Sequence, residues 1–165
     1  MELLILGAAA GGGLPQWNCA ASNSARIWQG DSAIRPATQS SLAASADGER
    51  WAVLNASPDI RAQIMATPDL HPRPGGSLRN SPIASVLVTN GDIDHVAGLL
   101  TLREGQAFDL VATPAIHAVL DANPIFEALN REVVTRRAVA LGEPFALLPG
   151  LEATLFPVPG KVALY

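Results

Sequence analysis

Residues 83–95, IASVLVTNGDIDH, decide the fold class of this chain. Their first part, residues 83–89, is a run of apolar and mostly β-branched side chains, which is typical of a strand buried on both faces of a sheet. Polar side chains follow immediately, and functional sites in α/β sheets gather at the carboxyl ends of such strands. The stretch therefore predicts a central strand that brings a cluster of polar residues to one edge of a sheet.

Strands and helices are predicted on both sides of this central strand. Before it, Asp47-Gly48 is a favoured tight-turn pair between two strands, and Ser57-Pro58 has the residue types of a helix start. The predicted strands are residues 2–6, 38–46, 49–55, 83–89, 108–112, 133–140, 145–148 and 151–157, and the predicted helices are residues 58–66, 96–103, 114–122 and 124–129. A hairpin followed by alternating strands and helices predicts a mixed sheet with helices on a face, an α/β or α+β layer fold.

Three segments of the sequence have no regular hydrophobic period. Residues 7–13, GAAAGGG, allow the backbone to turn tightly or to approach another group closely, but their spacing does not match the dinucleotide-binding motif. Residues 14–37 form a long predicted loop of small and polar side chains, and such a loop in a compact domain is often functional. Residues 67–82 are rich in proline and glycine, which predicts a surface loop.

The composition excludes several classes of protein. With 48% hydrophobic and 16% charged residues in a length of 165, the chain has the composition of a folded domain rather than of a disordered segment. A net charge of −4 without a basic stripe argues against a general nucleic-acid binder. No apolar run reaches the roughly 18 residues of a membrane helix. Cys19 is the only cysteine, which excludes an internal disulfide framework, and we expect a cytoplasmic protein.

The polar cluster after the central strand consists of Asn90, Asp92, Asp94 and His95. Three oxygen-bearing side chains and an imidazole on one loop are the ligand types of a metal site. The alternative is structural: Asn90 and Asp92 make hydrogen bonds within the turn, and Asp94 caps the following helix. The residues alone leave both interpretations open.

The segment at residues 88–98, VTNGDIDHVAG, resembles the H-x-H-x-D-H motif of the metallo-β-lactamase superfamily. Asn90 and Asp92 stand where the first two histidines usually stand, whereas Asp94 and His95 match the last two positions. This variation resembles one branch, the pyrroloquinoline quinone (PQQ) biosynthesis protein B family. Further strings support that branch: LGAAAGGGLPQWNC (6–19), TQSS (38–41), NASPDIRAQ (55–63), LLTLREG (99–105), NPIF (123–126), VTRR (134–137) and VPGK (158–161).

The resemblance covers essentially all 165 residues but only the N-terminal half of the family's length. It implies part of a four-layered αββα sandwich, a single domain whose metal site lies between two related halves. Further metal ligands and much of the substrate pocket would come from the missing C-terminal half. A half-sandwich exposes an apolar sheet face or an unpaired edge, so we expect self-association or a low melting point.

Members of the family often carry a C-x-C-x-x-C zinc site just after Trp-Asn. Here Cys19 keeps the first position, but Ala21 and Ser24 occupy the other two. One thiolate cannot complete a tetrahedral zinc site, so we expect no structural zinc at this position. Packing must hold the loop instead, and we expect Trp17 and Trp28 to anchor it.

The donor set of the cluster bears on the metal and the reaction. An amide and a carboxylate in place of two imidazoles shift the preference toward Fe(II), Mn(II) or Mg(II). The resemblance implies iron-dependent oxygenation of a tyrosine-derived precursor during PQQ biosynthesis. Two alternatives remain: a carrier that transports PQQ or its precursor, and an inactive truncated fragment. Asp92 and His95 are the expected direct ligands, Asp94 a ligand or an orienting group, and Asn90 a weaker ligand or a substrate contact.

Residues outside the cluster complete the candidate site. The family motif places Gln16, Trp17 and Asn18 near the metal, which makes them candidate cofactor-binding residues, although packing within the loop explains them equally well. His71 and His117 have no partner pattern, and we expect both on the surface.

Overall fold

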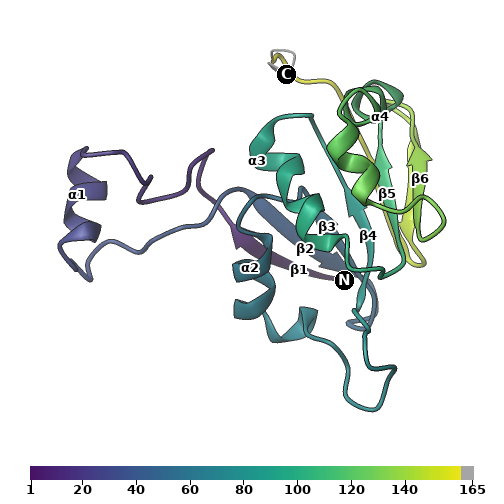
Figure 1. Cartoon of the computed structure of the whole chain (residues 1–165), viewed down its shortest axis with the longest axis horizontal. Helices are drawn as coiled ribbons and strands as arrows, with labels where there is room; N and C mark the ends of the chain where they lie inside the picture. The colour runs from purple at the N-terminus through teal and green to yellow at the C-terminus, as the bar shows by residue number, and fades with distance from the viewer. Residues whose placement is uncertain (161–165) are drawn as a thin grey trace.

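A mixed six-stranded sheet forms the centre of the computed structural model, which describes residues 1–160 (Figure 1). Each strand pairs with the next one along the chain, in the order β1-β2-β3-β4-β5-β6. Pairing is antiparallel from β1 to β3 and parallel from β3 to β6. The strands are β1 (Glu2–Gly7), β2 (Ser41–Ser45), β3 (Trp51–Leu54), β4 (Ile83–Leu87), β5 (Phe108–Ala112) and β6 (Val134–Ala138).

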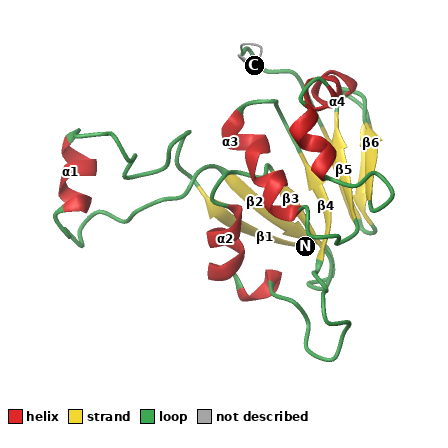
Figure 2. Cartoon of the chain, in the orientation of Figure 1, coloured by secondary structure: helices red, strands yellow, loops and turns green. Residues whose placement is uncertain are grey.

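Helices occupy the parallel crossovers, and a separate hairpin follows the sheet (Figure 2). The helical segments are α2 (Ile60–Ala66), η1 (Pro68–Leu70), α3 (Ile93–Val96), η2 (Ala97–Leu102), α4 (Pro114–Asp121) and η3 (Pro124–Ala128). The hairpin pairs β7 (Pro144–Leu148) with β8 (Leu151–Thr154). The strands from β3 to β6 need crossovers because parallel strands cannot be joined by a tight turn. The predicted α/β layer fold is therefore confirmed.

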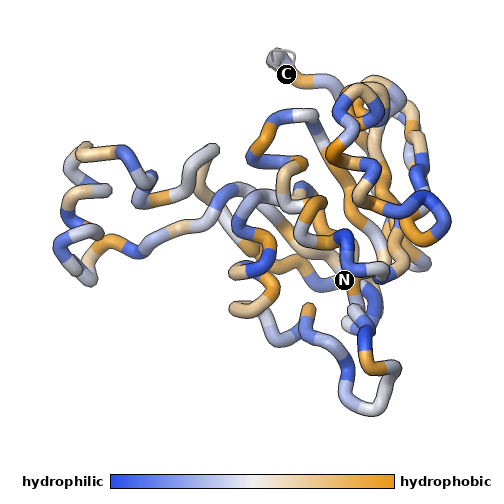
Figure 3. Tube along the Cα trace, viewed as in Figure 1, coloured by the Kyte–Doolittle hydropathy of each residue, from blue (hydrophilic) through white to orange (hydrophobic). Residues whose placement is uncertain are grey.

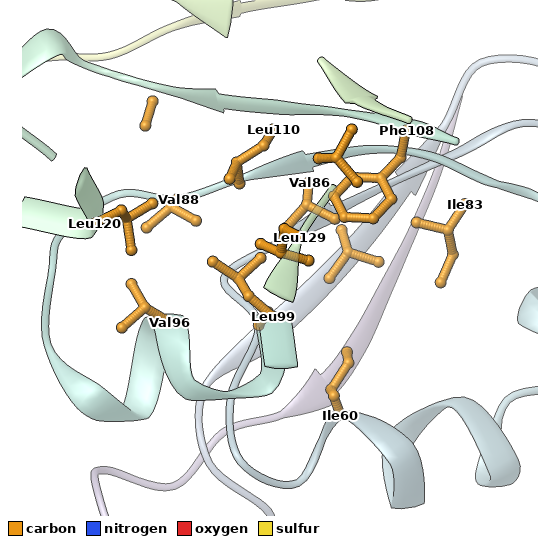
Figure 4. Close-up of a cluster of buried hydrophobic side chains, with 14 of the residues drawn as sticks. Ile60, Ile83, Val86, Val88, Val96, Leu99, Phe108, Leu110, Leu120 and Leu129 are labelled. Carbon is orange, nitrogen blue, oxygen red and sulfur yellow. The ribbon is translucent and has the colours of Figure 1, made fainter. Parts of the chain in front are cut away.

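The main hydrophobic core lies between the sheet and the helices. Val88 and Leu110 project from the central strands toward Val96 and Leu99, which follow the polar cluster (Figure 4). All four side chains are fully buried. This packing fixes the short helical segment α3–η2 against the carboxyl end of β4, and it thereby fixes the loop that carries Asp92 and His95.

The opposite face of the sheet carries a smaller core. Leu87 of β4 and Val111 of β5 pack there against the β7–β8 hairpin. Because β4 sends Val86 into the main core and Leu87 into this second one, it is buried on both faces, as its sequence predicts. The cover is partial, because Leu3 and Ile5 of β1 remain 58% and 72% exposed.

Residues 14–37 form an arm that extends away from the sheet (Figure 1). It contains α1 (Ser22–Trp28), a short helix that the sequence did not predict. At its base, the backbone amides of Leu14 and Ala37 each donate to the other's carbonyl oxygen at 2.8 Å. Hydrophilic and hydrophobic residues alternate along the arm at short intervals (Figure 3).

The expectation that two tryptophans anchor this arm is wrong. Trp17 is 82% exposed and Trp28 is 61% exposed. They border a shallow hollow together with Cys19, whose thiol has its pKa lowered by a hydrogen bond with the Ser24 hydroxyl. Backbone bonds at the base of the arm, rather than aromatic packing, hold it to the body.

Two predicted helix starts are displaced. The helix predicted from residue 58 begins at Ile60, because residues 58 and 59 form a turn that precedes it. In this turn the Asp59 amide donates to the Ser57 hydroxyl. The helix predicted from residue 96 begins at Ile93. The second displacement matters for the site, because it places Asp94 and His95 inside the first helical turn rather than before it.

Candidate metal centre

The loop after β4 is tied to the end of the neighbouring parallel strand, β3. Thr89 donates from its backbone amide and from its hydroxyl to Asn55 Oδ1, both at 2.9 Å. Asn55 itself has a positive φ of 64°, a conformation that asparagine adopts more readily than most residues. The ends of β3 and β4 are therefore joined directly where the polar cluster begins.

Backbone hydrogen bonds hold the helical turn that carries the cluster. The Ala56 amide donates to the His95 carbonyl oxygen, and the Gly98 amide donates to the Ala56 carbonyl oxygen, both at 2.8 Å. A Cβ atom at Gly98 would overlap the carbonyl oxygens of Ser57 and Ala56, so only glycine allows this approach. These hydrogen bonds fix the backbone of His95 independently of any bound ligand.

Asn90 and Asp92 have different roles in the turn. Asn90 Oδ1 accepts from the Asp92 amide at 2.9 Å, as the structural alternative predicts for this residue. Asp92 occupies the N-cap position of α3, yet its side chain makes no capping hydrogen bond. The backbone carbonyl of Asp92 accepts from the His95 and Val96 amides instead. The Asp92 carboxylate therefore makes no capping hydrogen bond to α3.

Asp94 and His95 lie side by side at the same edge. Asp94 is in the first turn of α3, so the structural alternative in which it caps this helix is wrong. Its Oδ1 lies 3.1 Å from His95 Nδ1, and the two side chains are 22% and 17% exposed. The angles do not make this contact a hydrogen bond, so His95 Nδ1 is buried without a hydrogen-bond partner. A buried imidazole nitrogen left in this way fits a site that receives a further group.

The glycine loop, residues 7–13, borders the Asp94 carboxylate. A Cβ atom added at Gly11 would lie 3.3 Å from Asp94 Oδ2, so Gly11 faces this carboxylate and leaves little room for a side chain between them. The Gln16 side chain packs against Gly12 in the same loop.

The remaining candidate cofactor-binding residues lie elsewhere. Trp17 and Asn18 are exposed and border the hollow of the arm together with Cys19 and Trp28. Of the three candidates from the first loop, only Gln16 contacts a segment that borders the cluster.

The cluster does not amount to a finished metal site by itself. Among residues 1–160, no three His, Cys, Asp or Glu side chains converge in a way that could hold a metal ion. Asp94 and His95 lie side by side and Asp92 precedes them in the same turn, so these residues offer at most part of a ligand set. Any closed coordination sphere would need donors from outside this part of the chain.

The two remaining histidines were expected on the surface, and for His117 this is wrong. His117 on α4 is only 9% exposed, and its Nε2 lies 3.1 Å from the Arg137 carbonyl oxygen of β6. His71 is half-buried, with Nε2 3.2 Å from the Met65 carbonyl oxygen. Both rings pair with backbone carbonyls rather than with the cluster, so the structure gives neither a place in the site.

Comparison with known proteins identifies the family. A model of the β-lactamase superfamily domain matches residues 50–164. Coenzyme PQQ synthesis protein B from Methylorubrum extorquens is 61% identical over the whole chain, and that from Ruegeria pomeroyi is 62% identical. The chain belongs to the PqqB family of the metallo-β-lactamase superfamily. It spans about half the length of these curated relatives, 54% in both cases.

Solved structures agree with this assignment. The crystal structure of Zn²⁺-bound PqqB from Methylobacterium extorquens superposes with a TM-score of 0.95 at 61% identity, over 99% of this chain and 54% of that one. A diphosphatase of the PhnP family matches 88% of this chain and 52% of its own length with a TM-score of 0.64 at 21% identity, which shows the fold alone. The metallo-β-lactamase-like fold is thereby confirmed, as a part of the fold of the longer PqqB proteins.

Sequence reasoning missed the polar residues that support the cluster from behind. Asn55, Gln39, Asp59 and Gln63 are all buried or half-buried. The last three form hydrogen bonds next to the glycine loop, and Asn55 accepts from Thr89 in the loop after β4. A signal was present, because Asn55, Asp59 and Gln63 lie in NASPDIRAQ and Gln39 lies in TQSS, two of the family-like strings.

None of the helices within residues 1–160 has the length and apolar character needed to span a membrane.

Proposed function

We propose that this PqqB homologue supplies one side of a divalent-metal centre that acts in PQQ biosynthesis. Asp92 and His95 are direct ligands, Asp94 is a ligand or orients His95, and Asn90 is a weaker ligand or contacts the substrate. The main support for this proposal is that the Asp94 carboxylate lies 3.1 Å from His95 Nδ1, a buried nitrogen that makes no hydrogen bond. The Zn²⁺-bound structure of a 61% identical PqqB supports a metal-dependent role.

The donor chemistry favours a harder metal than zinc as the working ion. Carboxylate and amide oxygens replace imidazoles at two positions of the superfamily motif, which favours Fe(II) or Mn(II). We propose Fe(II), whose open coordination positions would supply dioxygen chemistry for the oxygenation of a tyrosine-derived precursor. Within this chain, Asp94 lies beside the His95 ring and is either a second ligand or an orienting group, while the hydrogen bonds of the Ala56 and Gly98 amides fix the His95 backbone.

The reaction needs more than this chain provides. Because the described residues offer a partial ligand set, the remaining donors and most of the substrate pocket are expected from the other half of the full-length PqqB fold. Activity is therefore a property of the whole protein. A carrier role for PQQ or its precursor would also use this edge of the sheet, but it would require no product to form.

Metal binding by this chain can be tested with Mn²⁺, which broadens nearby resonances even when it binds weakly. We expect Mn²⁺ to broaden the amide signals of residues 90–95 first. Asp92→Ala and His95→Ala should weaken this binding by about 100-fold or more, since changes at outer-shell partners alone cost about 10–100-fold. Glu104→Ala is the matched control, because Glu104 is an exposed acid whose partners are Arg79 and Arg103. Unchanged broadening in both Asp92→Ala and His95→Ala would overturn the proposal.

The enzyme and carrier roles are separated in a full-length PqqB relative. Loaded with Fe(II) under dioxygen, it should convert a tyrosine-derived precursor to an oxygenated product detected by mass increase. Substitution of the matching aspartate and histidine should abolish this product. Tight binding of PQQ or precursor without any product would favour the carrier.

A further inference from the structure

A buried amide network lies between β2, α2 and the glycine loop, outside the proposed ligands. Gln63 of α2 is 2% exposed, and its Nε2 donates to the Gln39 carbonyl oxygen at 2.8 Å and to Thr38 Oγ1 at 3.0 Å. Its Oε1 accepts from the Ser57 hydroxyl at 3.2 Å. Every polar atom of this glutamine amide is therefore used, which holds the backbone before β2 firmly against α2.

Gln39 extends this network to the glycine loop. Its Nε2 donates to Asp59 Oδ2 at 3.0 Å, and its backbone amide donates to the same oxygen at 2.9 Å. Its Oε1 accepts from the Gly12 amide at 3.0 Å. The chemistry fixes the orientation of this side-chain amide, because a carboxylate can only accept and a backbone amide can only donate. Gln39 is 8% exposed, so these bonds have little competition from water.

The glycine loop is held by this network at both ends, and Gly11, next to the second of these ends, faces the Asp94 carboxylate. At one end, a Cβ atom on Gly7 would overlap the Gln39 carbonyl oxygen, so the backbones meet directly. At the other end, Gly12 has a φ of +92° and is bonded to the Gln39 side chain. Between them, Gly11 borders the Asp94 carboxylate, whose other side is bordered by His95.

We propose that Gln39 is a positioning residue for the metal centre. By holding the glycine loop against Asp94, it limits the rotamers of this carboxylate and keeps it beside His95. The inference rests on the proposed function and deepens it, because it names the support behind one of the proposed ligands. Gln39 touches no ligand directly and acts through Gly11 and Gly12.

The test replaces Gln39 by a residue of similar shape that cannot hydrogen-bond. In Gln39→Met we expect amide exchange at Gly12 to accelerate by about tenfold or more, and the Asp94 and His95 amide resonances to shift, in the metal-free chain. Mn²⁺ binding should weaken by about tenfold, the size typical of an outer-shell change. Asn123→Ala is the control, because it removes a partly buried side-chain hydrogen bond to Val119 far from the loop. It should lower the melting temperature without these two effects.

A conservative pair of variants at Asp59 separates positioning from general stability. Asp59→Asn keeps an oxygen that accepts from Gln39 and should stay close to the wild type in the Asp94 and His95 resonances. Asp59→Leu removes the acceptor and should reproduce Gln39→Met. The proposal is overturned if Gln39→Met loses stability while the metal-free Asp94 and His95 resonances keep their wild-type positions. If the wild type binds no Mn²⁺, the proposed function fails, whereas the metal-free resonances still decide whether Gln39 positions Asp94.

Discussion

At the scale of single residues, Gly98 shows how backbone contact determines the geometry of the site. Its amide donates to the Ala56 carbonyl oxygen while the Ala56 amide donates to the His95 carbonyl oxygen. These two hydrogen bonds bring the backbone at Gly98 against the backbone at Ala56 and Ser57, which leaves no room for a side chain at Gly98. The position of His95 thus depends on a residue that bears no functional group.

Gly98→Ala should destabilise the chain by about 2 kcal/mol, because the new methyl group forces the Ala56 and Ser57 carbonyl groups apart. Urea unfolding measures this loss. Gly142→Ala is the matched control: Gly142 has a φ of +78° but open space around it, so only backbone strain is added. Equal losses in the two variants would contradict the close-contact argument.

Residue environments were the least predictable feature of the sequence. The four residues of the cluster were predicted as site residues from their types and spacing, and the structure places them in the turn after β4 and the start of α3; their role stays a prediction. The exposure of Trp17 and the burial of His117 were both missed. Neither could be foreseen, because burial of a lone aromatic or histidine depends on which distant strand or loop faces it, and local sequence does not contain that information.

At the scale of elements, the hairpin between β2 and β3 depends on Asp47. Its Oδ1 accepts from the amides of Glu49 and Arg50, both at 2.9 Å. These bonds, with the Arg50 guanidinium and the Ser45 hydroxyl, hold the pKa of the Asp47 carboxyl well below its usual range. The turn is thus stabilised by the charged form of this side chain.

Asp47→Asn should therefore alter the pH dependence of stability. Because the pKa of Asp47 is lower in the folded state, its contribution is complete above the unfolded pKa near 4 and is lost as the pH falls toward the folded value. We expect the melting temperature of the variant to lie below that of the wild type at about pH 6 and to converge with it toward about pH 2. Melting curves across this range provide the measurement. A difference that stays constant with pH would show that the charge of Asp47 does not matter.

Elements with strong periodicity were predicted well, and short ones were not. The run at residues 83–89 was correctly assigned as a central strand, because its apolar side chains are needed on both faces. The start of α3 was placed three residues too late, since Asp92, rather than a later residue, occupies the N-cap position. The helix α1 lacks a side-chain cap and buries only Ser24, so it has no amphipathic pattern that a reader of the sequence could detect.

At the scale of the whole molecule, the sheet is covered unequally on its two faces. The helical face is closed over a continuous core, whereas the β7–β8 hairpin covers only part of the other face. Leu3 pairs with Ala44 and Ile5 with Leu42 on that second face, at the β1 edge of the sheet. The relatives are nearly twice as long as this chain, which spans 54% of them, and we expect their additional residues to cover this face.

In isolation, the 165-residue chain should self-associate through this face, because exposed apolar side chains on an edge strand favour pairing between copies. Leu3→Lys combined with Ile5→Lys should raise the monomer fraction in sedimentation velocity. These side chains are 58% and 72% exposed, so the substitutions remove little core packing and the fold should persist. Leu78→Lys is the control, since Leu78 is a fully exposed leucine in the loop before β4 rather than on the sheet. A wild-type chain that sediments as a monomer and melts sharply would show that the second face needs no cover, and that the hairpin alone completes a stable half of the fold.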